Sequence, residues 1–248
     1  MAIICWWSGG ITSAVACKKS LEKWDVRLVY IETGSHHPDT LRFKADCEKW
    51  YGQEIETIQN DKYTSHFDVI EKDKYVNGPA GARCTMVLKR RVREKWERDQ
   101  QIDGYVWGFE AGKKEEDRAD RIKLAQPKYN HYFPLIDEGL TKPDCIRIVQ
   151  EACIEVPMMY KLGFSNNNCI GCVKGGMAYW NLVRKHFPDE FNKMAKLERE
   201  LGRKCLRAYW LDELPLDAGR GTPPLVQECG ATGEGCSSEI SRNYYQRD

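Results

Sequence analysis

The sequence predicts an α/β fold, with a mainly parallel sheet that is covered by helices on both faces. The first sign is an apolar run at residues 3–7, which breaks into Ser8-Gly9-Gly10 before a helical pattern begins. A second apolar run, residues 26–31, ends abruptly at Glu32-Thr33-Gly34. Strand and helix patterns continue to alternate as far as residue 108, and this order is typical of parallel sheets with helical crossovers.

Local sequence signals support the strands and helices that we expect in the first half of the chain. Residues 3–7 suit a strand buried on both faces, because apolar residues there do not alternate with polar ones. The pair Pro38-Asp39 is a helix start signal. We expect strands over 3–7, 26–31, 54–58 and 104–108, and helices over 12–23, 40–50, 65–71 and 85–98, with a loop at 77–81.

The second half is predicted to be helical and rich in cysteine. The charge run 112–121 suits a mobile loop or an exposed helix, and Pro143 starts a short amphipathic helix over 142–152. Pro188 separates two helical patterns, 177–186 and 189–201. From Leu214 onward, Gly and Pro are too frequent for a long element. We therefore expect a nucleotide-binding domain over 1–140 and a helical region with a cysteine-containing tail over 141–248.

Composition limits the classes of function. The 248 residues are 42% hydrophobic and 30% charged, which is typical of a globular protein. Lys+Arg 38 against Asp+Glu 37 gives no case for a polyanionic partner from net charge. No apolar stretch approaches the length of a membrane span, and the first residues do not resemble an export signal. We expect a cytoplasmic protein with no membrane partner, and a homo-oligomer.

The turn after the first strand is the strongest candidate site. Gly9 and Gly10 let the backbone turn tightly and approach a ligand. Thr12 and Ser13 supply hydroxyls where a helix begins, with its first N–H groups unpaired. A strand, a glycine turn and a helix N-terminus together form a seat for phosphate. Ligands of such sheets bind beyond the carboxyl ends of the strands, so the loops at Ser8, Glu32 and Gly108 should converge.

The eleven cysteines are best explained as reduced thiols, since no export signal supports a disulfide framework. Six lie inside strand or helix patterns, and we assign them to packing: Cys5, Cys17, Cys47, Cys145, Cys153 and Cys205. Five lie beside loops rich in Gly, Asn or Pro, and these are candidates for chemistry: Cys84, Cys169, Cys172, Cys229 and Cys236. We interpret His36 and His37, in the loop after the second strand, as surface residues.

A pair of thiols two residues apart can point at one metal. Cys169 and Cys172 have this spacing, and Cys229 and Cys236 bring the number of loop thiols to four. Four thiolates suit tetrahedral Zn²⁺ or an iron–sulfur cluster, and Cys84 is able to replace one of them. A redox thiol pair and purely structural thiols are the alternatives. Spacing alone does not separate zinc from iron–sulfur.

An ordered set of motifs resembles one superfamily. Ser8–Ser13 resembles the PP-loop SGGxDS of ATP pyrophosphatases. The following segments resemble, in order, motifs of the phosphoadenosine phosphosulfate (PAPS) reductase-like branch: Glu32-Thr33-Gly34 with Pro38-Asp39-Thr40 and Phe43; Cys84-Thr85 with Lys89; Gly108 with the charged run through Arg118 and Arg121; Phe133–Asp137; and Gln227-Glu228-Cys229-Gly230. The chain is therefore similar to PP-loop proteins of the PAPS reductase-like family.

This resemblance implies a Rossmann-like fold of the PP-loop type and an enzyme that binds ATP with Mg²⁺. It would cleave ATP to AMP and pyrophosphate to adenylylate an acceptor in sulfur transfer, including thiolation of a nucleic acid. The phosphate and nucleoside residues would be Ser8, Gly9, Gly10, Thr12, Ser13, Glu32, Thr33, Gly34 and Gly108. Lys89, Arg118 and Arg121 would neutralise phosphate charge. Related proteins use cysteine sets that include a CxxC for a [4Fe–4S] cluster, so Cys169, Cys172, Cys229 and Cys236 would hold a cluster or Zn²⁺.

Two alternatives stay open. The first is a sulfonucleotide reductase, in which Cys229 attacks the sulfur of PAPS or adenylyl sulfate and a thioredoxin-like reductant, rather than a sulfur-donor protein, is the partner. The second is a nucleotide-binding subunit without turnover. Three positions depart from the family pattern: Thr12 stands where Asp is common, Glu110 where Arg is frequent, and Ala231-Thr232 follow Gly230 where His is expected. The last departure weakens the case for Cys229 as a nucleophile.

Overall fold

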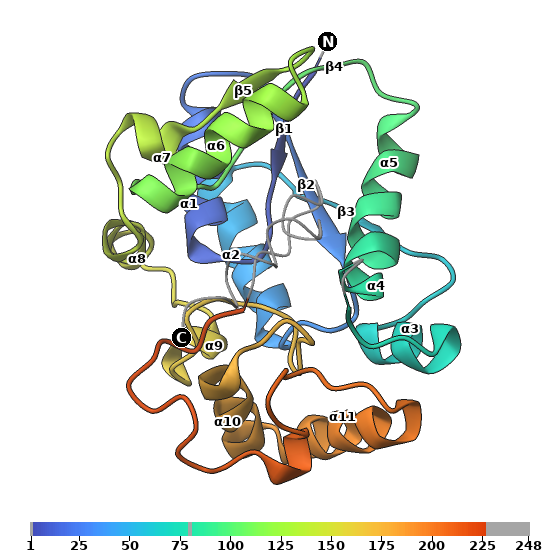
Figure 1. Ribbon diagram of the computed structural model, residues 1–248. Helices are drawn as coiled ribbons and strands as arrows, with labels where there is room; N and C mark the ends of the chain where they lie inside the picture. Colours follow the sequence, from blue (N-terminus) through green and yellow to red (C-terminus); the bar gives the residue numbers. More distant parts are fainter. Residues whose placement is uncertain (1, 79–80, 227–248) are drawn as a thin grey trace. The chain divides into compact units, whose positions relative to one another are not determined.

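The computed structural model describes residues 2–78 and 81–226 (Figure 1). Its strands are β1 (Ala2–Trp6), β2 (Val26–Glu32), β3 (Glu56–Gln59), β4 (Ile102–Val106) and β5 (Asn130–Tyr132). Its α-helices are α1 (Ile11–Leu21), α2 (Asp39–Tyr51), α3 (His66–Asp73), α4 (Arg83–Thr85), α5 (Arg91–Glu97), α6 (Lys113–Ala125), α7 (Pro134–Asp137), α8 (Lys142–Glu151), α9 (Met158–Lys161), α10 (Met177–His186) and α11 (Pro188–Leu201). A π-helical turn, η1 (Met86–Arg90), joins α4 to α5, and a 3₁₀ turn, η2 (Leu211–Glu213), follows α11.

The strands form one sheet in the order β3-β2-β1-β4-β5. Strand β1 pairs in parallel with β2 and β4, and β4 pairs in parallel with β5. In register, Ile4 lies opposite Arg27 on one side and Tyr105 on the other. The strand order reverses at β1, so the carboxyl ends of β1 and β4 flank the point where such sheets bind ligands. The predicted α/β class with a mainly parallel sheet is confirmed.

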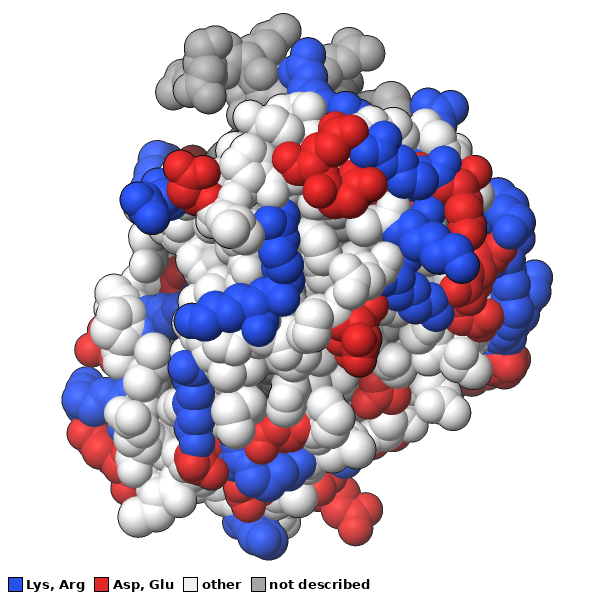
Figure 2. Space-filling view, turned by 90° about the horizontal axis from the view of Figure 1, so that it is seen from below, with Lys and Arg blue, Asp and Glu red and all other residues white. Residues whose placement is uncertain are grey.

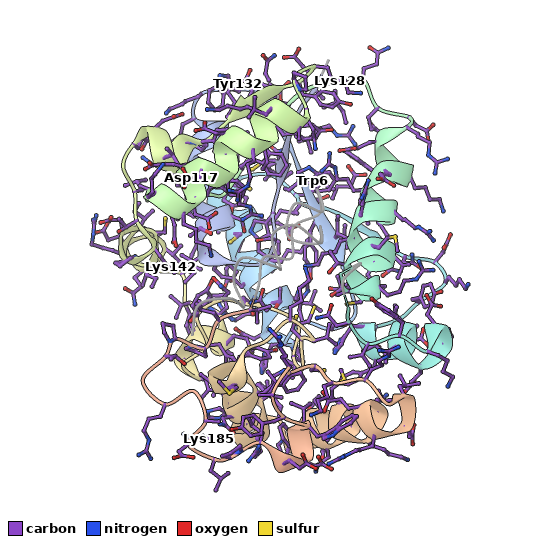
Figure 3. The ribbon with its side chains drawn as sticks, viewed as in Figure 1. Trp6, Asp117, Lys128, Tyr132, Lys142 and Lys185 are labelled. Atoms are coloured by element: carbon purple, nitrogen blue, oxygen red, sulfur yellow. The ribbon has the colours of Figure 1, made fainter. Side chains whose placement is uncertain are left out.

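Neighbouring residues of β1 explain why both faces of the sheet are covered. Ile4 packs in a cluster with Ala119 and Ile122 of α6. Cys5 faces the other way, where its sulfur lies 2.8 Å from that of Cys17 on α1. Trp6, labelled in Figure 3, returns to the first face and makes an edge-on contact with Trp96, with ring centroids 5.6 Å apart. This alternation, with apolar residues pointing both ways, explains why the run at residues 3–7 shows no polar period.

Element boundaries differ from expectation in a few places. Strand β3 begins at Glu56 instead of residue 54, because the Ile55 N–H donates to Glu48 Oε1 at 2.8 Å and is tied to the end of α2. The helix expected over 85–98 begins at Arg83 and contains the π-helical turn. The charge run 112–121 lies almost wholly in α6, which settles it as a helix. As expected, residues 214–226 contain no long element.

The described chain forms two compact units, each assembled from separate segments. Unit 1 contains the sheet and comprises residues 2–31, 38–58 and 95–158. Unit 2 comprises residues 32–37, 59–78, 81–94 and 159–226. Helix α8, which comes just after residue 140, packs on α1 within unit 1. The division of the chain at residue 140 stays a prediction.

Unit 2 has a core of its own. Helices α10 and α11 pack against each other (Figure 1). Tyr179 and Trp180 of α10 are fully buried there, together with Met194 of α11. Phe164 adds an edge-on contact with the Tyr179 ring at 5.4 Å. This core is the framework that carries the loop cysteines described below.

The surface carries both signs of charge. Figure 2 shows Lys and Arg side chains interspersed with Asp and Glu over one face, so neither sign forms a continuous field among the described residues seen there. Within residues 2–78 and 81–226, every helix is too short or too polar to cross a membrane.

Candidate functional site

The turn between β1 and α1 is fixed by its own serines. Gly9 adopts a φ of 81°, a left-handed conformation that suits glycine. Ser13 Oγ accepts hydrogen bonds from the Ser8 N–H at 3.1 Å and the Ser8 hydroxyl at 3.0 Å. The same hydroxyl donates to the Gly10 carbonyl at 2.8 Å. The Ser8–Ser13 segment, called the phosphate loop from here on, is therefore held in shape by hydrogen bonds among its own residues.

The N-terminal end of α1 is suited to an anion. Gly10 is the N-cap in extended conformation, and no described side chain caps the helix there. The first turn contains no Asp or Glu, because Thr12 stands at the position where an acid is common. A helix of this length presents a partial positive charge at its start, which an acidic side chain does not offset here. The electrostatics favour a phosphate group at this end.

Gly108 brings the end of β4 against the phosphate loop. A Cβ atom at Gly108 would lie 2.7 Å from Ser13 Cα and 2.9 Å from Ser13 N. Cβ atoms do not approach non-bonded backbone atoms this closely, so only glycine fits without a shift of the backbone. Of the three loops expected to converge, those at Ser8 and Gly108 lie together in unit 1, at the reversal point of the strand order. Glu32 belongs to unit 2, and its part in the convergence stays a prediction.

Helix α6 places Arg118 beside the end of β4. Its guanidinium carbon lies 4.1 Å from the Phe109 ring centroid, and it pairs with Glu115 at 3.2 Å. Arg121, one turn further on, is exposed. Glu110, where the family pattern has Arg, lies 3.8 Å from Lys142 Nζ (Lys142 is labelled in Figure 3), and burial raises the pKa of its carboxyl. Arg118 is thus the anchored basic group next to Gly108.

In unit 2, the Glu32–Gly34 turn closes on itself. Glu32 Oε1 accepts hydrogen bonds from the N–H groups of Thr33 and Gly34, each at 2.7 Å. Gly34 has a φ of 63°, and a Cβ atom there would lie 1.7 Å from the Thr64 carbonyl oxygen. Only glycine can occupy this position. The turn fixes the buried Thr33, whose Oγ1 lies 3.6 Å from Cys169 Sγ.

Beside Thr33 lies a small cavity of about 20 Å³, which opens to solvent. Its lining residues come from four segments of unit 2: Thr33, His66, Cys84, Thr85, Leu88, Lys89, Cys169, Cys172 and Val173. We call it the thiol cavity. It brings together Thr33, Lys89, Cys169 and Cys172, which the sequence singles out for different roles.

The Cys169–Cys172 turn is held by two buried side chains, His66 and Tyr179. Gly171 has a φ of 75°, and its carbonyl lies 3.1 Å from His66 Nε2. The Tyr179 hydroxyl donates to the Cys169 carbonyl at 2.5 Å and accepts from the Cys172 N–H at 3.0 Å. Burial raises the pKa of Tyr179 well above its usual value, so the hydroxyl keeps its proton for this bond. The two thiols are therefore presented by a fixed backbone.

The π-helical turn shapes the opposite wall. Lys89 lies within it, one turn after Thr85, and both line the cavity. An extra residue in a helical turn changes which side chains share a face, and such turns are frequent at functional sites. The regular helix that the sequence predicts over 85–98 does not reveal this turn.

His36 is a correction to the sequence interpretation. Its side chain is only 6% exposed, with Nδ1 3.9 Å from Glu32 Oε1 and 3.5 Å from Thr33 Oγ1. Burial lowers the pKa of His36 to about 4, and the nearby charge of Lys89 acts in the same direction. Nothing in the loop sequence distinguishes this histidine from a surface residue.

Cys205 is a second residue whose environment the sequence analysis missed. It lies outside α11, which ends at Leu201 and is capped by Gly202 in a left-handed conformation. It packs with Cys84 and Cys169 against the core that contains Cys172. The end of the helical pattern at residue 201 was the signal that could have separated it from the packing cysteines. Cys229 and Cys236 lie outside the described residues. Among those described, no three His, Cys, Asp or Glu side chains are arranged to hold a metal ion.

Comparison with known proteins relates the chain to one family and one fold. The family model of the phosphoadenosine phosphosulfate reductase domain matches residues 2–178. A crystal structure of phosphoadenylyl-sulfate (PAPS) reductase from Candida auris, in complex with phosphate, has a similar fold. The TM-score is 0.51 at 11% identity, covering 68% of this chain and 81% of that one, and at this identity the likeness concerns the fold alone. No curated protein sequence matches the chain.

Proposed function

This chain belongs to the phosphoadenosine phosphosulfate reductase domain family, and we propose that it binds ATP and cleaves it between the α- and β-phosphates to adenylylate an acceptor. The observation that carries the proposal is the phosphate loop. It joins a glycine turn to a helix start that has neither a capping side chain among the described residues nor an acidic first turn. Such a site holds phosphate through backbone N–H groups and hydroxyls.

The chain's own residues would act mainly by positioning and charge neutralisation. Ser8, Thr12 and Ser13 would hold the departing pyrophosphate, while Glu32–Gly34 would border the nucleoside. Arg118, Lys89 and Arg121 would offset charge as it develops on the phosphates. Mg²⁺ is expected to enter with the nucleotide, because it binds phosphate oxygens and retains several waters.

The proposed reaction is a displacement at the α-phosphorus. An acceptor oxygen attacks, the bond to the bridging oxygen breaks, and pyrophosphate leaves with that electron pair. A sulfur nucleophile can then displace AMP from the activated acceptor. The thiols of unit 2 favour such a sulfur pathway, with a sulfur-donor protein as partner and a nucleic acid among the candidate acceptors.

Sulfonucleotide reduction is the second candidate, favoured by the family to which the chain belongs. Cys229 would attack the sulfur of PAPS or adenylyl sulfate and release the nucleotide. A thioredoxin-like dithiol would then reduce the S-sulfo cysteine and liberate sulfite. The absence of His after Glu228-Cys229-Gly230 favours the first candidate over this one.

Two product assays separate the candidates. The chain is incubated with ATP and Mg²⁺ in one arm, and with PAPS or adenylyl sulfate plus reduced thioredoxin in the other. Pyrophosphate formation without sulfite supports ATP cleavage. Sulfite formation that is lost in Cys229→Ser overturns it in favour of reduction. ATP binding without either product, over a panel of RNA and small-molecule acceptors, supports a subunit without turnover.

A further inference from the structure

Two cysteines of unit 1 are in direct contact, one on each side of the phosphate loop in the chain. Cys5 lies on β1 and Cys17 on α1, and their sulfur atoms are 2.8 Å apart. The two side chains are only 1% and 0% exposed, so solvent does not enter between them. From the sequence both are assigned to packing, because the contact exists only once the strand and the helix have assembled.

This contact is closer than the packing of a protein core requires. Non-bonded carbon atoms in a core meet at about 3.5–4.0 Å, and sulfur is the larger atom. The two sulfurs of a disulfide bond are about 2.05 Å apart. The separation of the Cys5 and Cys17 sulfurs lies between these two distances. Joining them therefore needs a shift of less than about 1 Å.

We propose that Cys5 and Cys17 are a redox pair, whose disulfide bond locks β1 to α1 around the phosphate loop. The bond would close a covalent ring over residues 5–17 that contains Ser8–Ser13. Such a ring stabilises a fold mainly by restricting the unfolded chain. The inference does not rest on ATP binding or cleavage, because it concerns only the covalent state of the two sulfurs. A chain that does not bind ATP would still form the bond.

The oxidant is a hydroperoxide, and hydrogen peroxide is small and uncharged enough to enter a closed core. One thiolate attacks a peroxide oxygen, the O–O bond breaks, and a sulfenic acid and water form. The second thiol then attacks the sulfenic sulfur and expels its hydroxyl group as a second water, which leaves the S–S bond. In all, the thiols lose two electrons and two protons, and one peroxide is reduced to two waters. Because the sulfurs already touch, ring closure should precede further oxidation to sulfinic acid.

Burial determines how fast this pair reacts. It raises the pKa of the Cys17 thiol well above its usual value, and the adjoining Cys5 adds to the shift. The thiolate is the reactive form of cysteine. We therefore expect the pair to be oxidised slowly at neutral pH and faster at higher pH. The exposed Cys153 should react with peroxide before the pair does.

The test determines the covalent state of the two sulfurs in the full-length chain. The protein is treated with hydrogen peroxide, its free thiols are alkylated, and it is digested with trypsin for mass spectrometry. Because Lys18 is the first basic residue of the sequence, Cys5 and Cys17 share the peptide 1–18, which contains no other cysteine. We expect this peptide to lack two hydrogens and to carry no alkyl group. Alkylation of both cysteines, their conversion to sulfinic acid, or a bond from Cys17 to Cys47 overturns the proposal.

Thermal unfolding measures the lock itself. Oxidation should raise the unfolding temperature of the parent by at least about 4 °C more than that of Cys5→Ser, which cannot close the ring. Cys145→Ser is the matched control, because Cys145 of α8 is also fully buried. This control should show the same gain as the parent. Equal gains in the parent and in Cys5→Ser would show that the bond does not lock the loop.

A last comparison needs no variant, so it also holds if Cys5→Ser fails to fold. The oxidised parent is treated with a thiol reductant, first folded and then in urea. A disulfide between two fully buried sulfurs should survive in the folded chain and be reduced when the chain unfolds. Equally fast reduction in both states would place the bond outside the core and contradict the proposal.

Discussion

Gly108 is the residue on which the shape of the phosphate loop depends most directly. We predict that Gly108→Val weakens ATP binding at least about tenfold, or roughly 1.4 kcal/mol. The reason is steric: its Cβ would stand 2.7 Å from Ser13 Cα, so the start of α1 must move away from β4. Titration calorimetry with ATP and Mg²⁺ measures the effect.

Gly176→Ala is the control for this substitution. At Gly176, the nearest atom to a new Cβ is the Leu225 carbonyl oxygen at 3.7 Å, and the backbone φ is −77°. This variant should bind ATP like the parent. If a folded Gly108→Val variant binds ATP with unchanged affinity, the phosphates do not bind at the phosphate loop.

Glu198 offers a second test on a single residue. In Glu198→Ala, the N–H groups of Cys205 and Leu211 lose their acceptor, and unsatisfied buried donors cost roughly 1–3 kcal/mol each. We therefore expect the free energy of unfolding to fall by about 2–5 kcal/mol in urea denaturation. Glu200→Ala, which removes an exposed partner of Lys196 at 3.6 Å, should cost under about 1 kcal/mol. Equal losses in the two variants would show that Glu198 is not the buried acceptor of these two N–H groups.

Single functional residues could be predicted from the sequence where all residues of a site lie in one short segment. The serines and glycines of the phosphate loop are contiguous, so their grouping is visible in the chain. Cys205 and His36 were missed because their environments come from distant segments: Cys205 meets Cys84 and Cys172, and His36 is buried beside Thr33 and Lys89. Burial of a lone polar residue in a loop leaves no periodic pattern to detect.

At the scale of the elements, a substitution at the start of α1 should affect the stability of the protein and the binding of ATP in different ways. We predict that Gly10→Asp keeps or raises stability yet abolishes ATP binding. Gly10 is an N-cap in extended conformation, where Asp is a preferred residue. Its carboxylate would occupy the N–H groups that phosphate needs and repel the phosphate charge.

Gly10→Ser is the matched control, because serine caps a helix without adding charge. It should retain most of the ATP affinity. Thermal unfolding and calorimetry on both variants give the two readouts. An Asp variant that binds ATP like the parent would place the phosphates elsewhere, whereas one that unfolds would show that Gly10 is needed for the fold itself.

The elements themselves were largely predictable, since apolar runs and helix start signals are local. The π-helical turn at Met86–Arg90 was not. One extra residue in a turn alters the apolar pattern too little to detect, yet it decides that Leu88 and Lys89 both line the thiol cavity. Helices and strands are predicted from the periodicity of apolar residues. A single inserted residue barely changes that periodicity, although here it shapes the wall of the cavity.

For the whole molecule, alternating patterns were enough to predict the parallel sheet, but not the composition of the two units. Residues 32–37 leave the sheet-containing unit for the other, then the chain returns at residue 38. Such exchanges depend on contacts between segments more than a hundred residues apart, such as the Ile170 N–H donating to the Ser35 carbonyl at 2.9 Å. The linear sequence carries no marker for them.

Acid stability is a property of the whole chain that the buried histidines should dominate. Burial lowers the pKa values of both His66 and His36 to about 4, while unfolded histidine has a pKa of about 6.5. Between these values the unfolded chain binds more protons, so stability is complete above about pH 6.5 and declines as the pH falls toward 4. From pH 7 to pH 5, His66 alone should cost about 2 kcal/mol. Urea unfolding at both pH values measures the loss, and in His66→Gln the loss should shrink by that amount. If parent and variant lose equal stability on acidification, His66 is not neutral and desolvated in the fold, and the packing of the Gly171 turn against it is wrong.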